Sequence, residues 1–463
     1  MEFIFHGTGT SSALPLVPCI TSTPKISDIQ CRSCREAVAS MAHTEEATSE
    51  ELQDIKIARV ESGYKNKRGN TGGILRKRGP DGEWRTIVID VGKTFRDQAT
   101  WLFRKHRIRR IDAVILTHGH ADAIAGLDDL RAFTAPPSPQ AGQVIPIYLS
   151  RTTLSAVAQQ FPYLVDKNQA TGGGDVPSLV FKVFDDEEAD VNDEAGIRRG
   201  EGFDVHGIRV VPLPVHHGKY FTPPEKVERL DAPQLETQPS TPPQVIQSIN
   251  GNGAPITGKA IERSLTSLLY RKMVETEKKT VPFYCYGFVF DGKMVYLSDV
   301  SYIPATTWNV MLDAIKPHMN GETLTTSTVP LDDVIGPDKV PFPANASSLS
   351  ENTLPCLILD ALRLEPHVSH LSFLQSLSVA QKLSPAATYL VGFTHPAAHA
   401  QWEAACKEVQ RERAQGDEDS FVDAVEKSAV RQGEAMQRVW REVRDQWRGF
   451  VRPGYDGQVI TID

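Results

Sequence analysis

The chain has 463 residues, of which 40% are hydrophobic and 23% charged, and its formal net charge is -8. This composition is ordinary for a globular protein, and the length fits two or three average domains or one large α/β domain with insertions. The negative charge argues against a broad basic surface for nucleic acid, and no apolar run is long enough for a membrane span or a secretory signal. We therefore expect a cytoplasmic or nuclear protein without a membrane partner.

The N-terminal stretch predicts a strand over residues 2–5 that ends in the glycine turn of residues 6–10, read as HGTGT. Three cysteines follow within a short distance, at Cys19, Cys31 and Cys34. Cys31 and Cys34 form a CxxC pair, whose two-residue gap lets both thiolates reach one ion. A structural zinc, a redox dithiol and unligated thiols are the three interpretations, and no thioredoxin-like βαβ pattern favours the second. Without a secretory signal, we expect reduced thiols.

The next elements lead to the central stretch of the chain. Residues 70–75 and 85–90 predict paired strands around the turn 79–82, and Asp90 ends the second strand. Residues 94–108 have helical spacing. An apolar β run, residues 113–116, then precedes a cluster of polar side chains.

This cluster contains His118, His120 and Asp122 and is followed by a predicted helix. Two imidazoles two residues apart project to the same side of an extended segment. Neutral imidazole and carboxylate suit zinc, iron or manganese. The alternative is that both histidines are hydrogen-bonded surface residues.

Further strands are predicted along the rest of the chain, and several end in residues of the same ligand types. The predicted strands are residues 145–149, 208–215, 283–290, 294–297, 356–360, 387–393 and a closing strand within 455–463. Residues 283–290 and 294–297 form a hairpin around an Asp-Gly turn. The strand ends carry His217 after 208–215, Asp299 after 294–297 and His395 after 387–393. Convergence of several strand ends on metal-binding side chains is a specific signal.

The remaining segments are polar or helical. The acidic run 185–188 predicts a solvated loop. Residues 221–262 are rich in Pro, Gln and Thr and predict a disordered insertion, either a lid near the site or a neutral insertion. Helical spacing is found over 371–383 and, with a break near Gly416, over 400–448.

Seven segments of the sequence together resemble the metallo-β-lactamase superfamily. They are GTGT, the CxxC segment, THGHAD, PLPVHHGK, LSDVSYIP, HLSF and GFTHPAAH. Within it they are similar to the phosphoribosyl cyclic phosphate phosphodiesterase branch, and the quinone-cofactor synthesis protein B group looks similar too. The resemblance implies an α/β fold of αββα sandwich type, with metals at the shared edge of two sheets. We expect a hydrolase domain over 1–400, interrupted near 165–202, 221–262 and 320–352, and a C-terminal helical extension with a closing strand over 401–463.

The resemblance also implies residue roles at an active site with one or two zinc or manganese ions. The first metal position would use His118, His120 and His217, with Asp299 bridging both metals. The second would use Asp122, Asp299 and His395. The last histidine of the HxHxDH signature is Ala123 here, so we expect the second position to be weak, filled by water or empty.

Other roles follow from the same resemblance. A structural zinc would be held by Cys19, Cys31, Cys34 and His399. Asp122 could hold the attacking water as well as a metal, and His370 matches the family's proposed acid. The alternative for His370 is that it only forms hydrogen bonds at the start of a helix. Residues expected to support the site from outside the ligand set are Asp90, Asp128 and His216.

The leading functional interpretation is a metal-dependent phosphodiesterase acting on a small cyclic phosphate or nucleotide by metal-activated water. An RNA-processing metallo-nuclease is an alternative, which the acidic net charge and the missing basic arm disfavour. A thioester or lactam hydrolase is disfavoured by the His370 segment, which resembles phosphodiesterases more closely. A non-catalytic metal-binding scaffold is the remaining alternative, because Ala123 could mark a degenerate site.

Overall fold

The computed structural model describes residues 1–45, 47–172, 176–186, 196–198, 202–220, 281–315, 340–343, 346–349, 354–410, 419–447 and 449–463. Met1–Gly218 and Phe283–Asp463 form one compact unit. Lys219–Pro282 form a second, of which residues 219–220 and 281–282 are described. The predicted insertion 221–262 and most of the predicted insertion 320–352 therefore lie outside the described residues.

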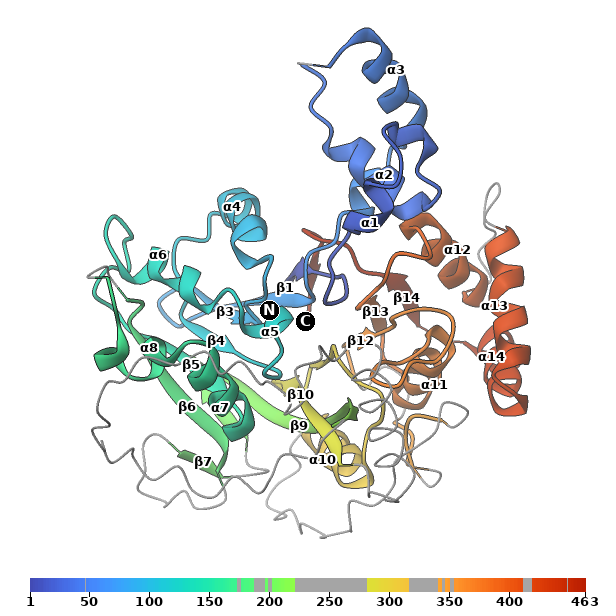
Figure 1. Cartoon of the computed structure of the whole chain (residues 1–463). Coiled ribbons are helices and arrows are strands. Elements are labelled where there is room, and N and C mark those ends of the chain that lie inside the picture. The colour runs from blue at the N-terminus through green and yellow to red at the C-terminus, as the bar shows by residue number, and fades with distance from the viewer. Residues whose placement is uncertain are drawn as a thin grey trace, which may run out of the picture. The chain divides into compact units, whose positions relative to one another are not determined.

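Two mixed sheets form the centre of the first unit (Figure 1). In the described residues, one sheet has the strand order β15 (Val459–Thr461), β1 (Glu2–Gly7), β2 (Gly72–Arg78), β3 (Trp84–Ile89), β4 (Ala113–Ile115), β5 (Ile145–Leu149), β6 (Leu179–Asp186) and β7 (Gly196–Arg198). The other has the order β14 (Phe450–Pro453), β13 (Ala387–Val391), β12 (Cys356–Asp360), β11 (Met294–Leu297), β10 (Pro282–Phe290), β9 (Ile208–Lys219) and β8 (Phe203–Val205).

Alternation along the strands explains why the sheets stack. Phe3 and Phe5 of β1 lie in the core between the sheets, whereas Ile4 packs into the core on the outer face. In β12, Ile358 faces the other sheet and Leu357 faces the outer helices. Because successive side chains of a strand point to opposite faces, strands with apolar residues on both faces must be covered on both sides.

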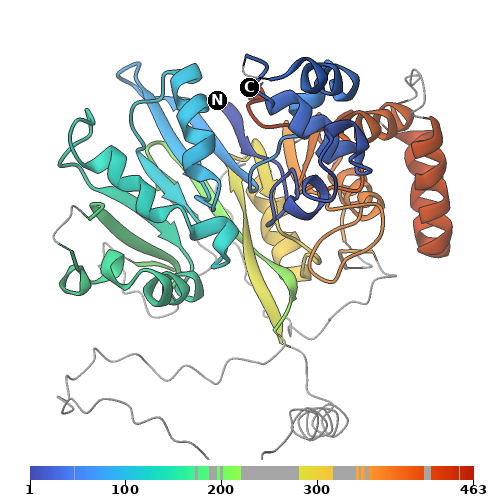
Figure 2. The ribbon, with the colours of Figure 1, turned by 45° about the horizontal axis from the view of Figure 1, so that its top comes forward.

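Helices supply the outer cover (Figure 1, Figure 2). The outer core of the first sheet includes apolar residues of α4 (Phe95–His106) and α7 (Arg151–Gln160). The outer core of the second sheet includes residues of α10 (Ala305–Ile315), α11 (Phe373–Leu383), α12 (His399–Val409), α13 (Asp419–Arg431) and α14 (Glu434–Gln446). The layers are therefore helix, sheet, sheet and helix, which confirms the predicted αββα sandwich.

Shorter helices lie along the loops between these elements. They are α1 (Val17–Ile20), α2 (Arg32–Met41), α3 (Ser49–Ala58), α5 (Ala121–Ile124), α6 (Arg131–Thr134) and α8 (Pro162–Val165). None of the helices within the described part of the chain is long and apolar enough to cross a membrane.

Parallel strand pairs determine where the functional residues meet. Strands β3 to β6 pair in parallel in one sheet, and β11 to β14 do so in the other. The carboxyl ends of parallel strands lie at the same edge of a sheet, where α/β proteins commonly bind ligands. Residues that follow β4, β11, β12 and β13 are therefore brought to one edge of each sheet.

The structure departs from the sequence prediction at several strands, including β7 and β8, which were not predicted. The acidic run 185–188, predicted as a solvated loop, overlaps the end of β6, and the predicted loop is wrong for Asp185. This carboxylate accepts hydrogen bonds from the Tyr286 hydroxyl at 2.9 Å and from the Arg151 backbone N–H at 2.7 Å. Strand β14 was not predicted either. The closing strand is confirmed, since β15 pairs with β1 and the Met1 amino group donates to the Ile462 carbonyl at 3.1 Å.

Candidate functional site

Five of the predicted ligand residues meet at the edge where the two sheets adjoin. His118 and His120 follow β4, and Asp122 lies in the short helix α5. His217 comes from β9 and Asp299 follows β11. Their ligand atoms, with that of His370, form three overlapping groups in which all atoms lie within 4.8 Å of one another: His118 with His120 and His217, His217 with Asp299 and His370, and His118 with Asp122 and Asp299. Hereafter these residues are called the His/Asp cluster.

The hydrogen bonds of His118 orient one of its nitrogens toward the cluster. Its Nδ1 lies 2.8 Å from the Thr117 hydroxyl, which itself donates to Asp90 Oδ2 at 2.8 Å. The hydroxyl proton is thus committed to Asp90, so His118 Nδ1 must donate and Nε2 carries the lone pair. Nε2 is buried, lies 3.8 Å from Asp122 Oδ1 and has no hydrogen-bond partner among the described residues. An unpartnered imidazole nitrogen beside a carboxylate is what a metal ligand requires.

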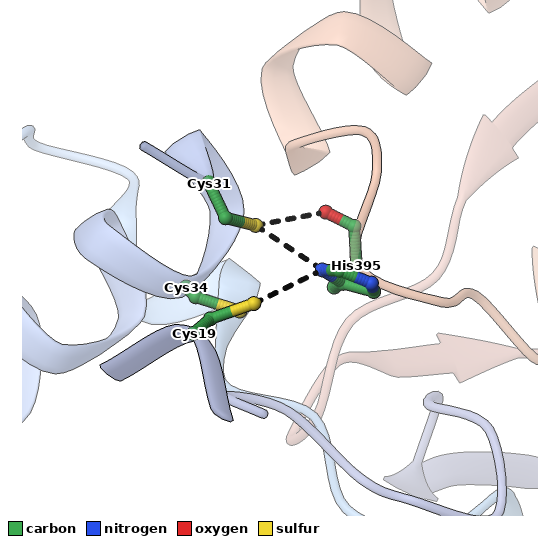
Figure 3. Close-up of side chains that lie close together, drawn as sticks. All are labelled: Cys19, Cys31, Cys34 and His395. Carbon is green, nitrogen blue, oxygen red and sulfur yellow. Dashed lines mark hydrogen bonds between the residues drawn. The ribbon is translucent and has the colours of Figure 1, made fainter. Parts of the chain in front are cut away.

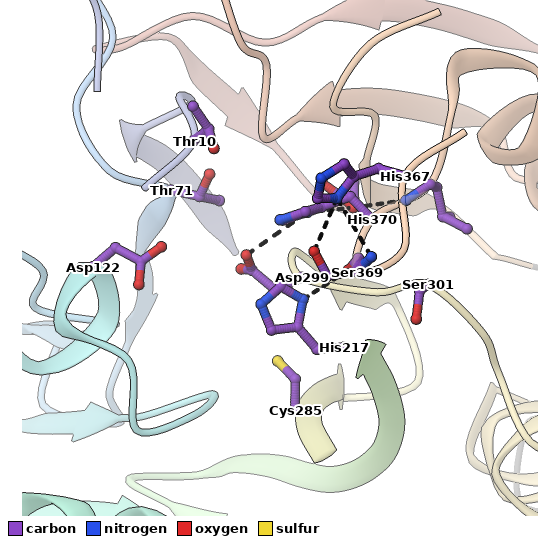
Figure 4. A network of polar contacts seen from close by, with 12 residues as sticks. Thr10, Thr71, Asp122, His217, Cys285, Asp299, Ser301, His367, Ser369 and His370 are labelled. Atoms are coloured by element: carbon purple, nitrogen blue, oxygen red, sulfur yellow. Dashed lines mark hydrogen bonds and ion pairs between the residues drawn. The ribbon is translucent and has the colours of Figure 1, made fainter. Parts of the chain in front are cut away.

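The protonated nitrogen of His217 can be assigned in the same way (Figure 4). Its Nδ1 lies 2.7 Å from the backbone carbonyl of Ser369. A carbonyl oxygen only accepts, so Nδ1 is protonated and Nε2 is the nitrogen with the lone pair. His120 is held differently, because its ring stacks on Phe283 with centroids 4.5 Å apart and planes 3° apart.

The electrostatics of the cluster favour the ligand forms of these side chains. Burial lowers the pKa of His120 and lowers that of His217 well below the ordinary histidine range. Burial alone would raise the pKa of Asp299, but the neighbouring histidines lower it to about 2. Neutral imidazoles next to an ionised carboxylate match the donor set of zinc or manganese. The residues present therefore fit a divalent metal ion at this place.

His370 stands beside the cluster with a carboxylate behind it. Its Nδ1 lies 3.0 Å from Asp360 Oδ2 and 4.0 Å from Asp299 Oδ1. Its ring centroid is 4.8 Å from that of His217. Burial disfavours the charged imidazole, but the charge and hydrogen bond of Asp360 outweigh it, and the pKa of His370 rises to about 9. The imidazole is therefore protonated at neutral pH and can donate a proton.

The local structure explains why His370 is held in place. Asp360 ends β12 and is fully buried, and its Oδ2 also accepts from the Leu371 backbone N–H at 3.1 Å. Helix α11 begins immediately afterwards at a capping box, in which Ser372 and Gln375 bond each other's backbone N–H groups. The helix start and the strand end together restrict the histidine between them.

The three residues predicted to support the site lie in different surroundings. Asp90 accepts from the Thr117 backbone N–H at 2.9 Å as well as from its hydroxyl. His216 packs its ring against Tyr284 and Tyr302. Burial lowers its pKa to about 4, and it belongs to none of the ligand groups in the described part of the chain.

Asp128 lies farther along, after α5. It forms an ion pair with Arg131 and accepts from the Tyr163 hydroxyl at 3.0 Å. Among the residues that the structure describes, it belongs to no group that could hold a metal. Asp128 is therefore not among the candidate metal ligands.

A second group of ligand-type residues lies among α1, α2 and the segment after β13 (Figure 3). It consists of Cys19, Cys31, Cys34 and His395, hereafter the Cys/His cluster. The sulfurs of Cys19 and Cys31 both lie 3.4 Å from His395 Nδ1. A tetrahedral zinc ion with Zn–S of about 2.3 Å and Zn–N of about 2.05 Å would separate sulfur and nitrogen by about 3.6 Å. The spacing therefore fits one zinc ion.

The Cys/His cluster corrects the predicted roles of two histidines. His395 was assigned to the second active-site metal and His399 to the cysteines, but the structure places His395 with the cysteines. His399 instead lies 3.0 Å from Arg68 through Nδ1, and its ring is buried. The sequence could not separate the two because they are four residues apart after the same strand. The turn into α12, which begins at His399, decides which ring faces the cysteines.

Three residues of the site had no predicted role. They are Asp360, which holds His370, and Thr117 and Ser369, which fix the tautomers of His118 and His217. The signal for Asp360 was present, because it is an acidic residue at the end of an apolar strand. Thr117 and Ser369 act through a hydroxyl and a backbone carbonyl, and such roles depend on contacts that no sequence pattern shows.

Comparisons with known proteins agree with this architecture. Residues 85–237 match the family model of the beta-lactamase superfamily domain. A curated relative, the octanoyltransferase of Porphyromonas gingivalis, is 25% identical over 219 residues, which are 47% of this chain and 31% of that protein. The chain thus matches about a third of the length of this relative.

The chain is also similar to several solved structures, among them the following three. A diphosphatase from the PhnP family is 18% identical with a TM-score of 0.48, and the match covers 100% of this chain and 98% of that one. Zinc-bound PqqB from Methylobacterium extorquens is 13% identical with a TM-score of 0.47, and both chains are covered at 100%. The short form of human tRNase Z is 11% identical with a TM-score of 0.40, again with 100% of both chains covered. The domain match over residues 85–237 and the layered arrangement of the two sheets are consistent with the metallo-β-lactamase superfamily.

Proposed function

We propose that the protein is a metal-dependent hydrolase that cleaves a phosphodiester bond in a small substrate, such as a cyclic phosphate or a nucleotide. The observation that carries this proposal is the position of His370, which is held by Asp360 and lies next to His217 and Asp299. A histidine that can donate a proton, next to a cluster that fits a divalent metal ion, supports this proposal.

The residues of the His/Asp cluster divide the work of hydrolysis between them. A divalent ion held by His118, His120, His217 and Asp299 would activate a water molecule and neutralise charge on a phosphoryl oxygen. Asp122 lies beside His118 Nε2 at 3.8 Å, close enough to accept the proton that the water loses. The water oxygen then bonds to phosphorus, and the ester bond on the opposite side of the phosphorus breaks.

The leaving oxygen departs as an alkoxide and needs a proton. His370 can supply it, because the buried carboxylate of Asp360 keeps the imidazole charged at neutral pH. A β-lactam or thioester has a different leaving group, and the sequence around His370 resembles phosphodiesterases more closely. The formal net charge of -8 favours a small substrate over a long RNA.

The test is hydrolysis of bis(p-nitrophenyl) phosphate and of small cyclic phosphates by protein loaded with manganese or zinc. We expect metal-dependent turnover that Asp299→Ala abolishes, because this variant removes a metal ligand. Asp128→Ala is the matched control, since Asp128 lies outside the ligand groups and should leave turnover near the wild-type value. Bound metal without turnover on any phosphodiester, or turnover that survives Asp299→Ala, would contradict the proposal.

A further inference from the structure

We propose that the His/Asp cluster holds one metal ion rather than two, and that Asp122 and His370 remain outside its coordination sphere as proton-transfer groups. This inference rests on the proposed function for the roles of those two residues. The number of ions, however, follows from the ligand geometry alone.

The three ligand groups are not independent sites. The first and second share His217, the first and third share His118, and the second and third share Asp299. His118 and His217 each have one ring nitrogen committed to a protein oxygen, so each offers a single nitrogen to a single ion. An ion bound by His118, His120 and His217 would thus use both shared histidines, and Asp299, which shares one ligand group with His118 and another with His217, would be available as a fourth ligand.

A second ion beside it would find few ligands left. Among the described residues only the Asp122 and Asp299 carboxylates and His370 remain, and no ligand group contains both Asp122 and His370. A zinc site normally takes three or four protein ligands, and most sites include nitrogen or sulfur donors. The carboxylates of Asp122 and Asp299, of which Asp299 is also a ligand of the first ion, do not meet this requirement.

In the described part of the chain, the neighbouring segments supply no replacement. Ala123 is buried, and its carbonyl accepts from the Val91 backbone N–H at 2.8 Å. At the end of β13, Gly392 has a φ of +80°, and a Cβ added there would lie 2.3 Å from Asp360 Oδ1. A ligand side chain at this position would therefore collide with the carboxylate that holds His370. His395, farther along, is part of the Cys/His cluster.

One ion leaves Asp122 free to accept a proton. Its side chain is half-buried in α5, and Oδ1 faces His118 Nε2 at 3.8 Å, the nitrogen that would bind the ion. The geometry therefore assigns Asp122 to proton transfer and His118 to metal binding, although they are only four residues apart.

The test counts metal ions by a readout separate from turnover. Purified protein is stripped with a mild chelator, and metal analysis verifies that one zinc per chain remains, as thiolates retain zinc in preference to manganese. Manganese is then titrated while its electron paramagnetic resonance is recorded. We expect one equivalent with the six-line spectrum of an isolated ion, and none in His217→Ala. Asp122→Asn should still bind one equivalent, with affinity changed by no more than about threefold, while turnover falls by about 10²-fold or more.

Two results would overturn the inference. One is uptake of two manganese equivalents with the spectrum of a spin-coupled pair, and the other is loss of manganese in Asp122→Asn. These outcomes are distinct from failure of the proposed function. A single bound ion without phosphodiester hydrolysis would refute the function and leave the count standing, whereas a coupled pair with hydrolysis would refute the count and leave the function standing.

Discussion

The two ligand clusters of this chain are built in different ways. The Cys/His cluster takes three ligands from residues 19–34 and one from the segment after β13, and it contains no carboxylate. The His/Asp cluster draws its residues from separate strand ends of both sheets and combines imidazoles with carboxylates. A protonatable pair, His370 and Asp360, lies against it.

This difference shows how one fold can keep a structural ligand cluster apart from a reactive one. Four sulfur and nitrogen ligands satisfy a tetrahedral ion and leave no open position, as in structural zinc sites. The His/Asp cluster has an exposed ligand in His120 and groups that can donate or accept protons. Damage to one cluster should therefore lower stability, and damage to the other should lower turnover.

The largest effect is expected for His120→Ala. Its ring is exposed and stacks on Phe283, so its removal should change the melting temperature little. Turnover should fall by about 10³-fold, because the proposed metal ion, which would neutralise charge on the reacting group, loses one of its ligands. Phosphodiester hydrolysis and thermal unfolding, measured on the same preparation, check this separation. A large fall in the melting temperature of His120→Ala would contradict it.

Cys31→Ser should give the opposite pattern. Cys31 Sγ lies 3.4 Å from His395 Nδ1 and is one of the four ligand-type groups of the cluster, so its loss should release a bound zinc. If free zinc is present at about 1,000 times its dissociation constant, loss of the site lowers the free energy of unfolding by about 4 kcal/mol. The melting temperature should then fall by roughly 10 °C. Metal analysis should show one zinc fewer per chain. Turnover per folded molecule should remain within about twofold, and Cys406→Ser, outside both clusters, is the control for loss of a buried thiol.

Asp360→Asn tests the pair beside the His/Asp cluster. Loss of the carboxylate removes the charge that raises the pKa of His370 to about 9, so the acid should lose its proton at a lower pH. General acid catalysis requires the protonated imidazole, so turnover in the wild type should fall as the pH rises through about 9. In the variant this fall should begin at lower pH, and turnover at neutral pH should decrease by about 10²-fold. A pH–rate profile that keeps the wild-type alkaline limb would rule out His370 as the acid.

The sequence was most informative where function follows directly from residue type at a strand end. The order of apolar strands and of His118, His120, His217 and Asp299 could be predicted, because alternation and spacing are local properties. The αββα layering was implied by the resemblance to the metallo-β-lactamase superfamily, and the structure explains it by strands that are apolar on both faces. Most strand bounds were predicted to within a few residues, but β6 was missed because its acidic end suggested a loop.

The parts that could not be predicted depend on how a turn is folded. His395 and His399 both follow β13, and only the start of α12 determines that His395 faces the cysteines while His399 contacts Arg68. Asp360 is a strand-end carboxylate like Asp299, yet one lies among the ligands and the other behind His370. Sequence spacing identifies such residues as candidates, whereas the contacts assign their roles.

Thr117→Val gives the smallest expected effect. It tests whether metal binding can be weakened at the His/Asp cluster without a change at the Cys/His cluster. Valine keeps the shape of threonine but removes the hydroxyl that accepts from His118 Nδ1 and donates to Asp90. His118 would then lose the contact that fixes its tautomer, and metal affinity at the His/Asp cluster should fall by about 10-fold. The Cys/His cluster has no such hydroxyl relay to Asp90, so its zinc should be retained. Thr117→Ser keeps the hydroxyl and should restore manganese affinity to within about twofold of wild type. A similar loss in both variants would mean that packing at this position, rather than tautomer control, determines the affinity.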